Sequence, residues 1–325
     1  MKKALRFAVF AVAATCMLAF AGCSGEPSDE PSSPTDTSTT DALEWEPLTS
    51  LDQITVSDTE LGIEPSVEFE KMIKADSTLI STLIEGSGTV VQPPGIIGIY
   101  YAGYNTRDGV RFDGNFDKTA SAVSSSGFIA GFNKALDGQK IGSRVLVAIA
   151  SEDGYASGNA DAGILAGDTL VFVIDIIDGQ YYEPVGTLVA EGNEYATVTF
   201  DNGVPIPQAL PDIAAPADTV STVLIPGDVT RTVAESDYVV VNYVEVNYAT
   251  GEVLSGTYGG DSVMIKLASM IPGWRNGLLG QAMGSRLLLV VPPADAYPDG
   301  DSSRELPAGQ TLLYVVDVLY VVASG

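Results

Sequence analysis

Histidine is missing from the sequence, which contains 325 residues and only 2 cysteines. Without histidine, a Ser-His-Asp triad, a Cys-His pair and the usual histidine metal sites are excluded, so conventional hydrolase mechanisms become poor candidates. One cysteine, Cys16, lies in an apolar N-terminal run that we expect to be removed, which leaves no pair for a structural disulfide. We therefore expect apolar cores to supply the stability, and we expect neither a metal site nor a cofactor.

Basic residues are also scarce. The sequence has 16 lysines and arginines against 42 aspartates and glutamates, which gives a formal net charge of −26. Three of the basic residues belong to the N-terminal segment that we expect to be cleaved, so the mature chain has 13 against 42 and a charge of about −29. Nucleic acid and anionic lipid headgroups are poor partners for such a chain, and the excess of acid is best explained by solubility.

The first residues have the pattern of a secretory signal peptide, which we place at residues 1–22. Three basic residues precede an apolar run at residues 7–21. The run ends in the letters FAGC, which resemble the bacterial lipobox, so we expect Cys23 to carry a lipid that holds the protein at the outer face of the cell membrane. The alternative is cleavage as a freely secreted protein, with Cys23 as a leftover thiol.

The segment after Cys23 has a strongly biased composition. Residues 24–41 are all Ser, Thr, Pro, Asp or Glu, apart from one glycine. Such a composition cannot bury enough apolar surface to fold. We therefore predict a disordered linker over residues 23–47, which tethers the folded part of the chain to the membrane.

The remainder of the chain contains one module twice. Residues 129–158 and 271–300 match without insertion or deletion, and their shared glycines, arginines and tyrosines are 142 positions apart, as Tyr155 and Tyr297 are. A constant offset across several motifs indicates two complete modules rather than one shared sheet. We predict two domains, at residues 48–178 and 180–325.

The local patterns in each module predict both a helix and strands. Apolar residues at helical spacing, as in Phe128, Phe132 and Leu136, predict a short amphipathic helix. A glycine suited to left-handed backbone follows, and a Gly-Ser-Arg turn then leads into a β-rich run. The closing runs, residues 170–177 and 312–322, are rich in Val and Leu, as buried central strands are. We predict an α+β fold in which each module is a twisted antiparallel β-sheet with one helix on its concave face.

Further β-rich segments precede each module. Residues 54–56 and 79–84 come before the first module, and residues 197–200 and 220–225 come before the second. We expect these leading strands to pair with the core sheet of their own domain. The proline-rich span at residues 204–216 is a candidate link or edge segment, because proline is tolerated mainly at sheet edges.

The repeated residues resemble the FKBP family of peptidyl-prolyl cis-trans isomerases. The family pattern of V-I-x-G-W, a helix, G-x-x-x-G-x-R, a strand and a tyrosine loop is similar to residues 270–297, which begin MIPGW. In the first module the similarity extends to residues 100–103 and 108–113 upstream and to residues 163–165 and 169–172 downstream. The resemblance implies two tandem FKBP-like domains, each a twisted antiparallel β-sheet wrapped on one short helix, and peptidyl-prolyl isomerase activity.

In the first module the resemblance implies an aromatic pocket for proline. Phe132 would form its floor in place of the family's tryptophan, Tyr155 would donate its hydroxyl to a substrate carbonyl, and Asp113 would interact with the twisted amide. The phenylalanine that is usual on the strand before Phe128 has no counterpart here, and Val123 is the nearest large apolar residue. The implied pocket residues are Tyr101, Phe112, Asp113, Phe128, Ile129, Phe132, Tyr155, Ile164 and Phe172.

The second module keeps the tryptophan floor but not the whole pocket wall. Leu254-Ser255 stands where the family has a Phe-Asp pair, and Ile265 lies near the place of the strand phenylalanine. Such a pocket could bind proline, or the fold could be kept without catalysis. The alternative for the final aromatic of each module, Phe172 or Tyr314, is that it simply fills a core. The implied second pocket consists of Tyr243, Leu254, Ile271, Trp274, Tyr297, Leu306 and Tyr314.

Two main hypotheses of function follow. The first is a surface-anchored isomerase whose partners are proline-containing exported polypeptides, and whose Phe112-Asp113 pair acts together with Tyr101 and Tyr155. The second is a non-catalytic FKBP-like chaperone or protein-binding module, which the replaced pair in the second module favours. A lipoprotein that captures a small solute for a transporter would share the signal and the linker, but it would normally need α/β lobes. The sequence does not indicate an oligomeric state.

Overall fold

The computed structural model describes residues 44–118 and 120–323. The expected signal peptide, Cys23 and most of the predicted linker lie outside these residues. The described chain contains the repeated module twice, and we call the part up to residue 179 copy one and the part from residue 180 copy two. In the described part, no helix has the length and apolar character needed to cross a membrane.

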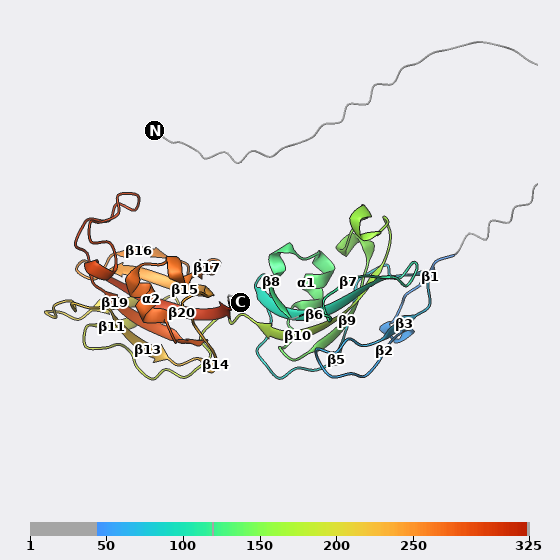
Figure 1. Cartoon of the computed structure of the whole chain (residues 1–325), viewed down its shortest axis with the longest axis horizontal. Coiled ribbons are helices and arrows are strands. Elements are labelled where there is room, and N and C mark those ends of the chain that lie inside the picture. Colours follow the sequence, from blue (N-terminus) through green and yellow to red (C-terminus); the bar gives the residue numbers. More distant parts are fainter. Residues whose placement is uncertain (1–43, 119, 324–325) are drawn as a thin grey trace, which may run out of the picture. The chain divides into compact units, whose positions relative to one another are not determined.

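Copy one is built on a sheet of six antiparallel strands. Its order is β5-β9-β10-β6-β7, and β8 pairs with the remaining part of the same edge of β6. The helix α1 (Ala130–Leu136) packs against one face of this sheet, over the central strands (Figure 1). The strands are β5 (Leu79–Ile84), β6 (Ile96–Asn105), β7 (Arg111–Gly114), β8 (Ser121–Ser124), β9 (Arg144–Ile149) and β10 (Leu170–Gly179).

Copy two repeats this topology strand for strand. Its order is β13-β19-β20-β15-β16, with β17 on β15, and α2 (Pro272–Leu278) occupies the place of α1. The predicted pair of α+β domains, each an antiparallel sheet with one short helix, is therefore confirmed. The strands are β13 (Val220–Ile225), β15 (Tyr238–Asn247), β16 (Val253–Gly256), β17 (Val263–Lys266), β19 (Arg286–Val291) and β20 (Leu312–Val322).

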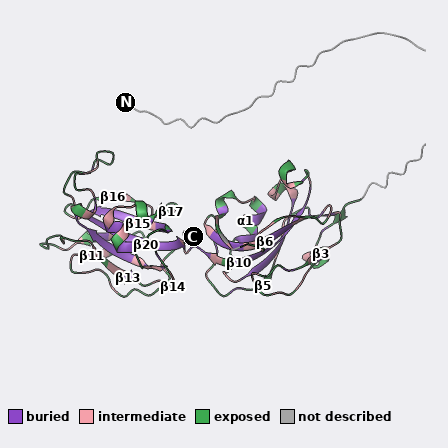
Figure 2. Ribbon diagram, in the orientation of Figure 1, coloured by how far each residue is buried: buried purple, intermediate pink, exposed green. Residues whose placement is uncertain are grey.

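The central strands are apolar on both sides because both faces of each sheet are covered. Along β10, Phe172 and Ile174 point to the core under α1, whereas Val171 and Val173 point to a second core on the opposite face. This alternation follows the two-residue period of a strand. Antiparallel sheets commonly leave one face to solvent, and the second core explains why these strands are instead continuous apolar runs. Figure 2 shows the central strands as buried.

The second face of the copy-one sheet is covered by the N-terminal part of that copy. Leu48, Ile54 and Ile73 are buried there against β9 and β10. The segment contains the parallel pair β1 and β4 and the antiparallel pair β2 and β3. These strands are β1 (Glu46–Pro47), β2 (Ile54–Val56), β3 (Val67–Phe69) and β4 (Ile73–Lys74).

Two expectations need correction here. Residues 46–47, which the sequence placed in the linker, form β1, because the adjacent Leu48 is anchored in the second core. Residues 54–56 do form a strand, but that strand pairs with β3 and not with the core sheet. The edge of the core sheet is already taken by residues 79–84, which pair with β9 as expected.

Copy two covers its second face with a hairpin. Strand β11 (Ala196–Asp201) pairs with β12 (Val204–Ala209), and the apolar side of the hairpin packs on β19 and β20. Residues 197–200 therefore do not join the core sheet, whereas residues 220–225 do. The proline-rich span begins as a strand of this hairpin rather than as a link. A further pair is β14 (Asp228–Thr232) with β18 (Ala282–Met283).

Matching turns bring the helix back to the sheet in both copies. The helices are followed by Gly138 and Gly280, with φ of +75° and +77°, the left-handed backbone that the sequence predicted. Short 3-10 turns occupy most of the remaining loops. They are Leu51–Gln53, Ser125–Gly127, Ser151–Asp153 and Ala160–Ala162 in copy one, and Leu267–Ser269 and Pro293–Asp295 in copy two.

The arginine of each Gly-Ser-Arg turn forms a buried ion pair across the sheet. Arg144 on β9 donates to both carboxylate oxygens of Asp175 on β10, at 2.6 and 2.7 Å. Its remaining N–H groups donate to the carbonyl oxygens of Thr59, Glu60 and Ile63, so the pair also fixes the N-terminal segment. In copy two the equivalent distances are 2.6 and 2.8 Å between Arg286 and Asp317.

Candidate functional site

A cavity of about 170 Å³ lies between α1 and the sheet of copy one. It is lined by residues from β6, β7, β8, β10, α1 and the loop after β9, which are far apart in the sequence and converge because the sheet curves around the helix. The sequence-predicted residues in its lining are Tyr101, Asp113, Phe128, Ile129, Phe132, Tyr155 and Phe172. Val123 also lines it, as do Ile99, Asn115 and Gly127, which the sequence reasoning did not single out.

The floor of this cavity is an aromatic cluster centred on Phe132. Its ring lies 5.2 Å from Phe172 and 5.9 Å from Tyr101, and both contacts are edge to face, at 82° and 88°. The centroid of the Phe128 ring lies 4.8 Å from that of Phe132. Edge-to-face packing is a preferred arrangement of aromatic rings. Phe132 is only 5% exposed, so the floor is held rigidly from below.

Two predicted pocket residues lie behind the lining and not in it. The ring of Phe112 packs edge to face on Phe172, with centroids 5.6 Å apart, and thereby supports the wall of the cavity. Ile164 is buried in the same core. Phe112 and Ile164 therefore support the pocket wall from behind and do not line the cavity.

The polar side of the cavity is formed by Tyr101 and Asp113. The Tyr101 hydroxyl donates to Asp113 Oδ2 at 2.9 Å. Asn115 holds the strand below, since it accepts from the Tyr101 N–H at 2.8 Å and donates to the Ile99 carbonyl at 2.9 Å. Burial and the hydrogen bond to Asp113 raise the pKa of Tyr101 to about 12, so its hydroxyl stays protonated at physiological pH.

The corresponding cavity of copy two is larger, at about 260 Å³. Trp274 forms its floor, with the rings of Tyr243 and Tyr314 edge to face at 5.4 and 5.5 Å. The predicted residues in the lining are Tyr243, Ile271, Trp274, Tyr297 and Tyr314, and Ile265 lines it as well. Leu254 and Leu306 pack in the core behind it.

The polar side of the second cavity differs from that of the first. Ser255 takes the position of the aspartate, and its hydroxyl lies 2.9 Å from that of Tyr243, so a hydrogen bond is kept without a charge. Glu245 and Arg304 also line this cavity and form an ion pair. Neither Glu245 nor Arg304 was among the residues predicted from the sequence, because the corresponding residues of copy one, Gly103 and Ala162, carry no polar side chain.

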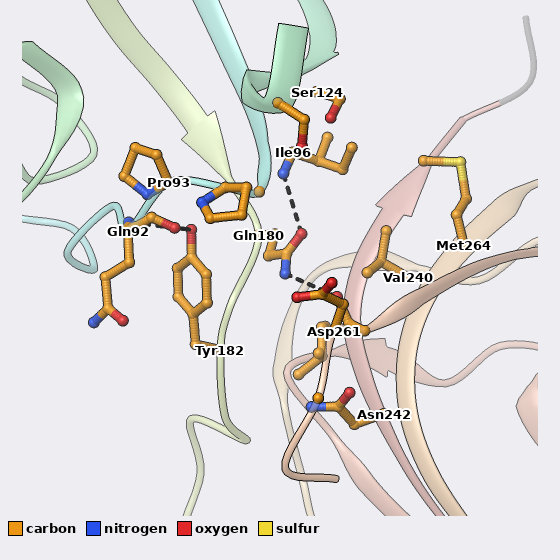
Figure 3. A pocket seen from close by; sticks show the side chains of 16 residues that line it. Gln92, Pro93, Ile96, Ser124, Gln180, Tyr182, Val240, Asn242, Asp261 and Met264 are labelled. Atoms are coloured by element: carbon orange, nitrogen blue, oxygen red, sulfur yellow. Dashed lines mark hydrogen bonds between the residues drawn. The ribbon is translucent and has the colours of Figure 1, made fainter. Parts of the chain in front are cut away.

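A third cavity, of about 460 Å³, lies beside the segment that follows β10 (Figure 3). Gln180 is at its centre, where Oε1 accepts from the Ile96 N–H at 3.1 Å and Nε2 donates to Ser262 Oγ at 3.2 Å. The Tyr182 hydroxyl is hydrogen-bonded to the backbone of Gln92. The side chains of Gln180 and Tyr182 thus hold the local backbone in place, and we assign no chemistry to this cavity.

Across residues 44–118 and 120–323, no group of three or more Cys, Asp or Glu side chains is arranged to hold a metal ion. The two aromatic cavities, each with one polar side, are the candidate sites of the chain.

Comparison with known proteins gives the family. The family model described as FKBP-type peptidyl-prolyl cis-trans isomerase matches residues 88–177 and 229–319, which contain the two cavities. A probable FK506-binding protein of Corynebacterium glutamicum is 31% identical over 115 residues, which are 35% of this chain and 97% of that protein. The peptidyl-prolyl cis-trans isomerase FKBP9 of Mus musculus is 25% identical over 223 residues, which are 65% of this chain.

The extent of these similarities differs. The chain spans only 32% of the length of mouse FKBP9. Among solved structures, FkpA from Escherichia coli is 31% identical, with 33% of this chain and 49% of that chain covered and a TM-score of 0.31. Because the family model covers more than half of the sequence in two separate segments, the chain belongs to the FKBP-type peptidyl-prolyl cis-trans isomerase family and contains two domains of that family in tandem.

Proposed function

We propose that the protein isomerises prolyl bonds of exported polypeptides at the outer face of the cell membrane, and that copy one is its more active domain. The observation that carries the proposal is the cavity of copy one, in which an aromatic floor faces a hydrogen-bonded Tyr101 and Asp113. Support for the cellular location comes from the signal pattern and from Cys23, which precede the described residues.

The chemistry of prolyl isomerisation fits such a cavity. The reaction breaks no covalent bond, and its barrier of about 18–20 kcal/mol comes from twisting a resonance-stabilised amide. Twisting reduces the charge separation across the carbonyl, so removing the amide from water favours the twisted form. A proline ring seated on Phe132 would bring its amide beside Tyr101 and Asp113. No acid-base pair is needed, in agreement with the absence of histidine.

The test compares wild-type protein with a variant whose wall is copied from copy two. Phe112→Leu with Asp113→Ser should lower the isomerisation rate of the full mature chain on prolyl peptides about tenfold, which corresponds to ~1.4 kcal/mol of transition-state stabilisation. The matched control is Phe116→Leu, because Phe116 lies just after β7 and stacks on Tyr100 outside the cavity. A wild-type protein that does not exceed the uncatalysed rate would reject the isomerase proposal.

A second candidate function is a non-catalytic binding module, and copy two favours it. Its tryptophan floor is intact, whereas its wall has lost the aspartate and gained an ion pair. The roles of the two copies are reversed if the copy-one wall variant isomerises prolyl peptides as fast as the wild-type chain, whereas Trp274→Leu isomerises them more slowly.

A further inference from the structure

The wall of the copy-two cavity carries a charged pair that copy one lacks. Glu245 stands 142 positions after Gly103, and Arg304 stands 142 positions after Ala162, so both arise by substitution within the repeat. Glu245 is on β15 and Arg304 is in the loop between β19 and β20. Both side chains line the cavity above Trp274.

The geometry leaves one buried carboxylate oxygen unpaired. Arg304 Nη2 donates to Glu245 Oε2, and the Arg304 guanidinium lies 5.2 Å from the centre of the Tyr297 ring. The Glu245 side chain is only 3% exposed. Its other oxygen, Oε1, is buried and has no hydrogen-bond partner among the described residues. Tyr314 is the cross-strand partner of Glu245, and burial together with the nearby Glu245 carboxylate raises the pKa of its hydroxyl. The Tyr314 hydroxyl is nevertheless not within hydrogen-bonding geometry of Oε1.

Copy one has no room for such a group. A Cβ atom on Gly103 would come within 2.5 Å of Phe172 Cε1 and 3.0 Å of Phe112 Cζ, so the aromatic wall itself excludes a side chain there. In copy two the second of these rings is replaced by Leu254. The Phe-Asp pair is thus not the only difference between the two cavities: copy one has an aromatic wall at this place, and copy two has a polar wall.

We propose that the copy-two cavity selects prolyl peptides in which a residue next to the proline carries a carboxamide, that is asparagine or glutamine. A carboxamide N–H can donate to the buried Glu245 Oε1, and its carbonyl can accept from Arg304, whose side chain is 30% exposed. A buried acceptor without a partner is costly, so a ligand that supplies the donor gains from relieving it. This inference rests on the proposed function, in which the cavities take prolyl peptides.

Other side chains fit this wall less well. An aliphatic side chain leaves Oε1 unpaired, a basic side chain meets Arg304, and an acidic side chain meets Glu245. A site built around a buried polar group rejects analogues that cannot pair with it much more strongly than an apolar site rejects a change of size. The ion pair is neutral as a unit, which favours a neutral ligand group with both a donor and an acceptor.

The two tryptophans of the chain allow a test on the full mature protein. Trp45 is 36% exposed in the N-terminal segment, whereas Trp274 is the floor of the copy-two cavity. In a Trp45→Phe background, Trp274 is the single tryptophan, so its fluorescence reports binding to this cavity alone. The probes are blocked peptides of the form Xaa-Pro-Xaa with Asn, Asp, Leu or Lys at both Xaa positions, so that neither side of the proline has to be chosen.

The expected result is a dissociation constant for the Asn peptide that is at least about tenfold lower than for the Asp, Leu and Lys peptides, since a hydrogen bond to a charged group contributes that much. Glu245→Gly with Arg304→Ala gives copy two the residues of copy one and should abolish the preference. If that variant does not fold, Glu245→Met decides, because it keeps the approximate size of the side chain, removes the carboxylate acceptor and should also abolish the preference.

Three results would overturn the inference: equal affinities for the four peptides, a preference that survives these variants, or no response of Trp274 to any peptide. None of them touches the proposed function, because isomerisation by the full mature chain is measured separately in the same samples. Conversely, Asn-selective binding with no isomerisation would support the selective cavity and reject the enzyme.

Discussion

The hydroxyl groups of Tyr243 and Ser255 lie 2.9 Å apart, which equals the distance from the Tyr101 hydroxyl to Asp113 Oδ2. The tyrosine of each copy is thus hydrogen-bonded in the same way, although one partner is a carboxylate and the other a hydroxyl. A serine keeps the orientation of the phenol, but it does not place a negative charge beside the bound peptide. We expect this difference in charge to separate the two cavities in rate.

The first prediction concerns the ionisation of Tyr101. Burial and the hydrogen bond to Asp113 raise its pKa from 10.0 to about 12. Because folding favours the neutral phenol, the contribution of this group to stability is complete below pH 10 and is lost as the pH rises through about 12. The phenolate absorbance of wild type minus that of Tyr101→Phe should therefore show almost no ionised Tyr101 at pH 10. N-acetyltyrosinamide is the control, and a half-ionised Tyr101 at that pH would contradict the assignment.

The second prediction concerns the close packing of Gly103. In Gly103→Ala the new methyl group must displace Phe172 or Phe112, and overpacking of this kind costs about 1–3 kcal/mol of folding free energy. We expect the isomerisation rate of copy one to fall together with the stability. Gly127→Ala is the matched control, since Gly127 lines the same cavity but its Cβ would meet nothing within 4 Å. Similar losses in the two variants would show that the contact with Phe172 is not the cause.

The third prediction concerns the buried ion pair of copy one. Arg144→Met leaves the Asp175 carboxylate buried without its partner, which costs about 3–5 kcal/mol of unfolding free energy. Arg286→Met should cost less, because no backbone carbonyl is bonded to Arg286 among the described residues and its side chain is 11% exposed against 2% for Arg144.

Urea unfolding measures this difference, provided that the two domains are followed separately. Trp274 is buried in the core of copy two and reports on that copy, whereas Trp45, which is 36% exposed beside β1, reports on the N-terminal segment that Arg144 fixes in copy one. Equal destabilisation by the two arginine variants would show that the carbonyls of the N-terminal segment add nothing to the Arg144 pair.

The fourth prediction concerns the proposed lipid anchor. Cys23→Ala should move the protein from the membrane fraction to the medium, because the thiol that would carry the acyl chains is lost. The control is Cys16→Ala, which changes the other cysteine of the chain and should leave the protein in the membrane fraction. An intact mass equal to that of the unmodified mature chain would reject lipidation.

The strands and helices of the two cores could be predicted from sequence because their patterns are local. The closing strand of copy two, Leu312–Val322, has the predicted bounds, and both helices are followed by the predicted left-handed glycines. The covering segments were predicted less well. Residues 54–56 and 197–200 have strand patterns, but a strand pattern does not tell whether the strand adds to the edge of a sheet or packs on its face.

The polar wall of copy two could not be predicted from the family pattern. Glu245 and Arg304 are 59 positions apart, and only the folded chain brings them together. One local signal was present: a glutamate in the middle of the run Tyr238–Asn247, at a position where the alternation places an inward-facing residue. A charged residue at such a position indicates a partner, but it does not identify that partner.

The covering segment of copy one has a mechanical consequence. A chain held through Cys23 would transmit any pull to residue 44 and then to β1, whose two residues pair with β4. The backbone of Leu48 is hydrogen-bonded to Lys74, and its side chain is buried on the face of the sheet opposite the cavity. Tension on the tether would therefore be borne first by this outer layer. The aromatic cavity would keep its shape while the attachment point stretches.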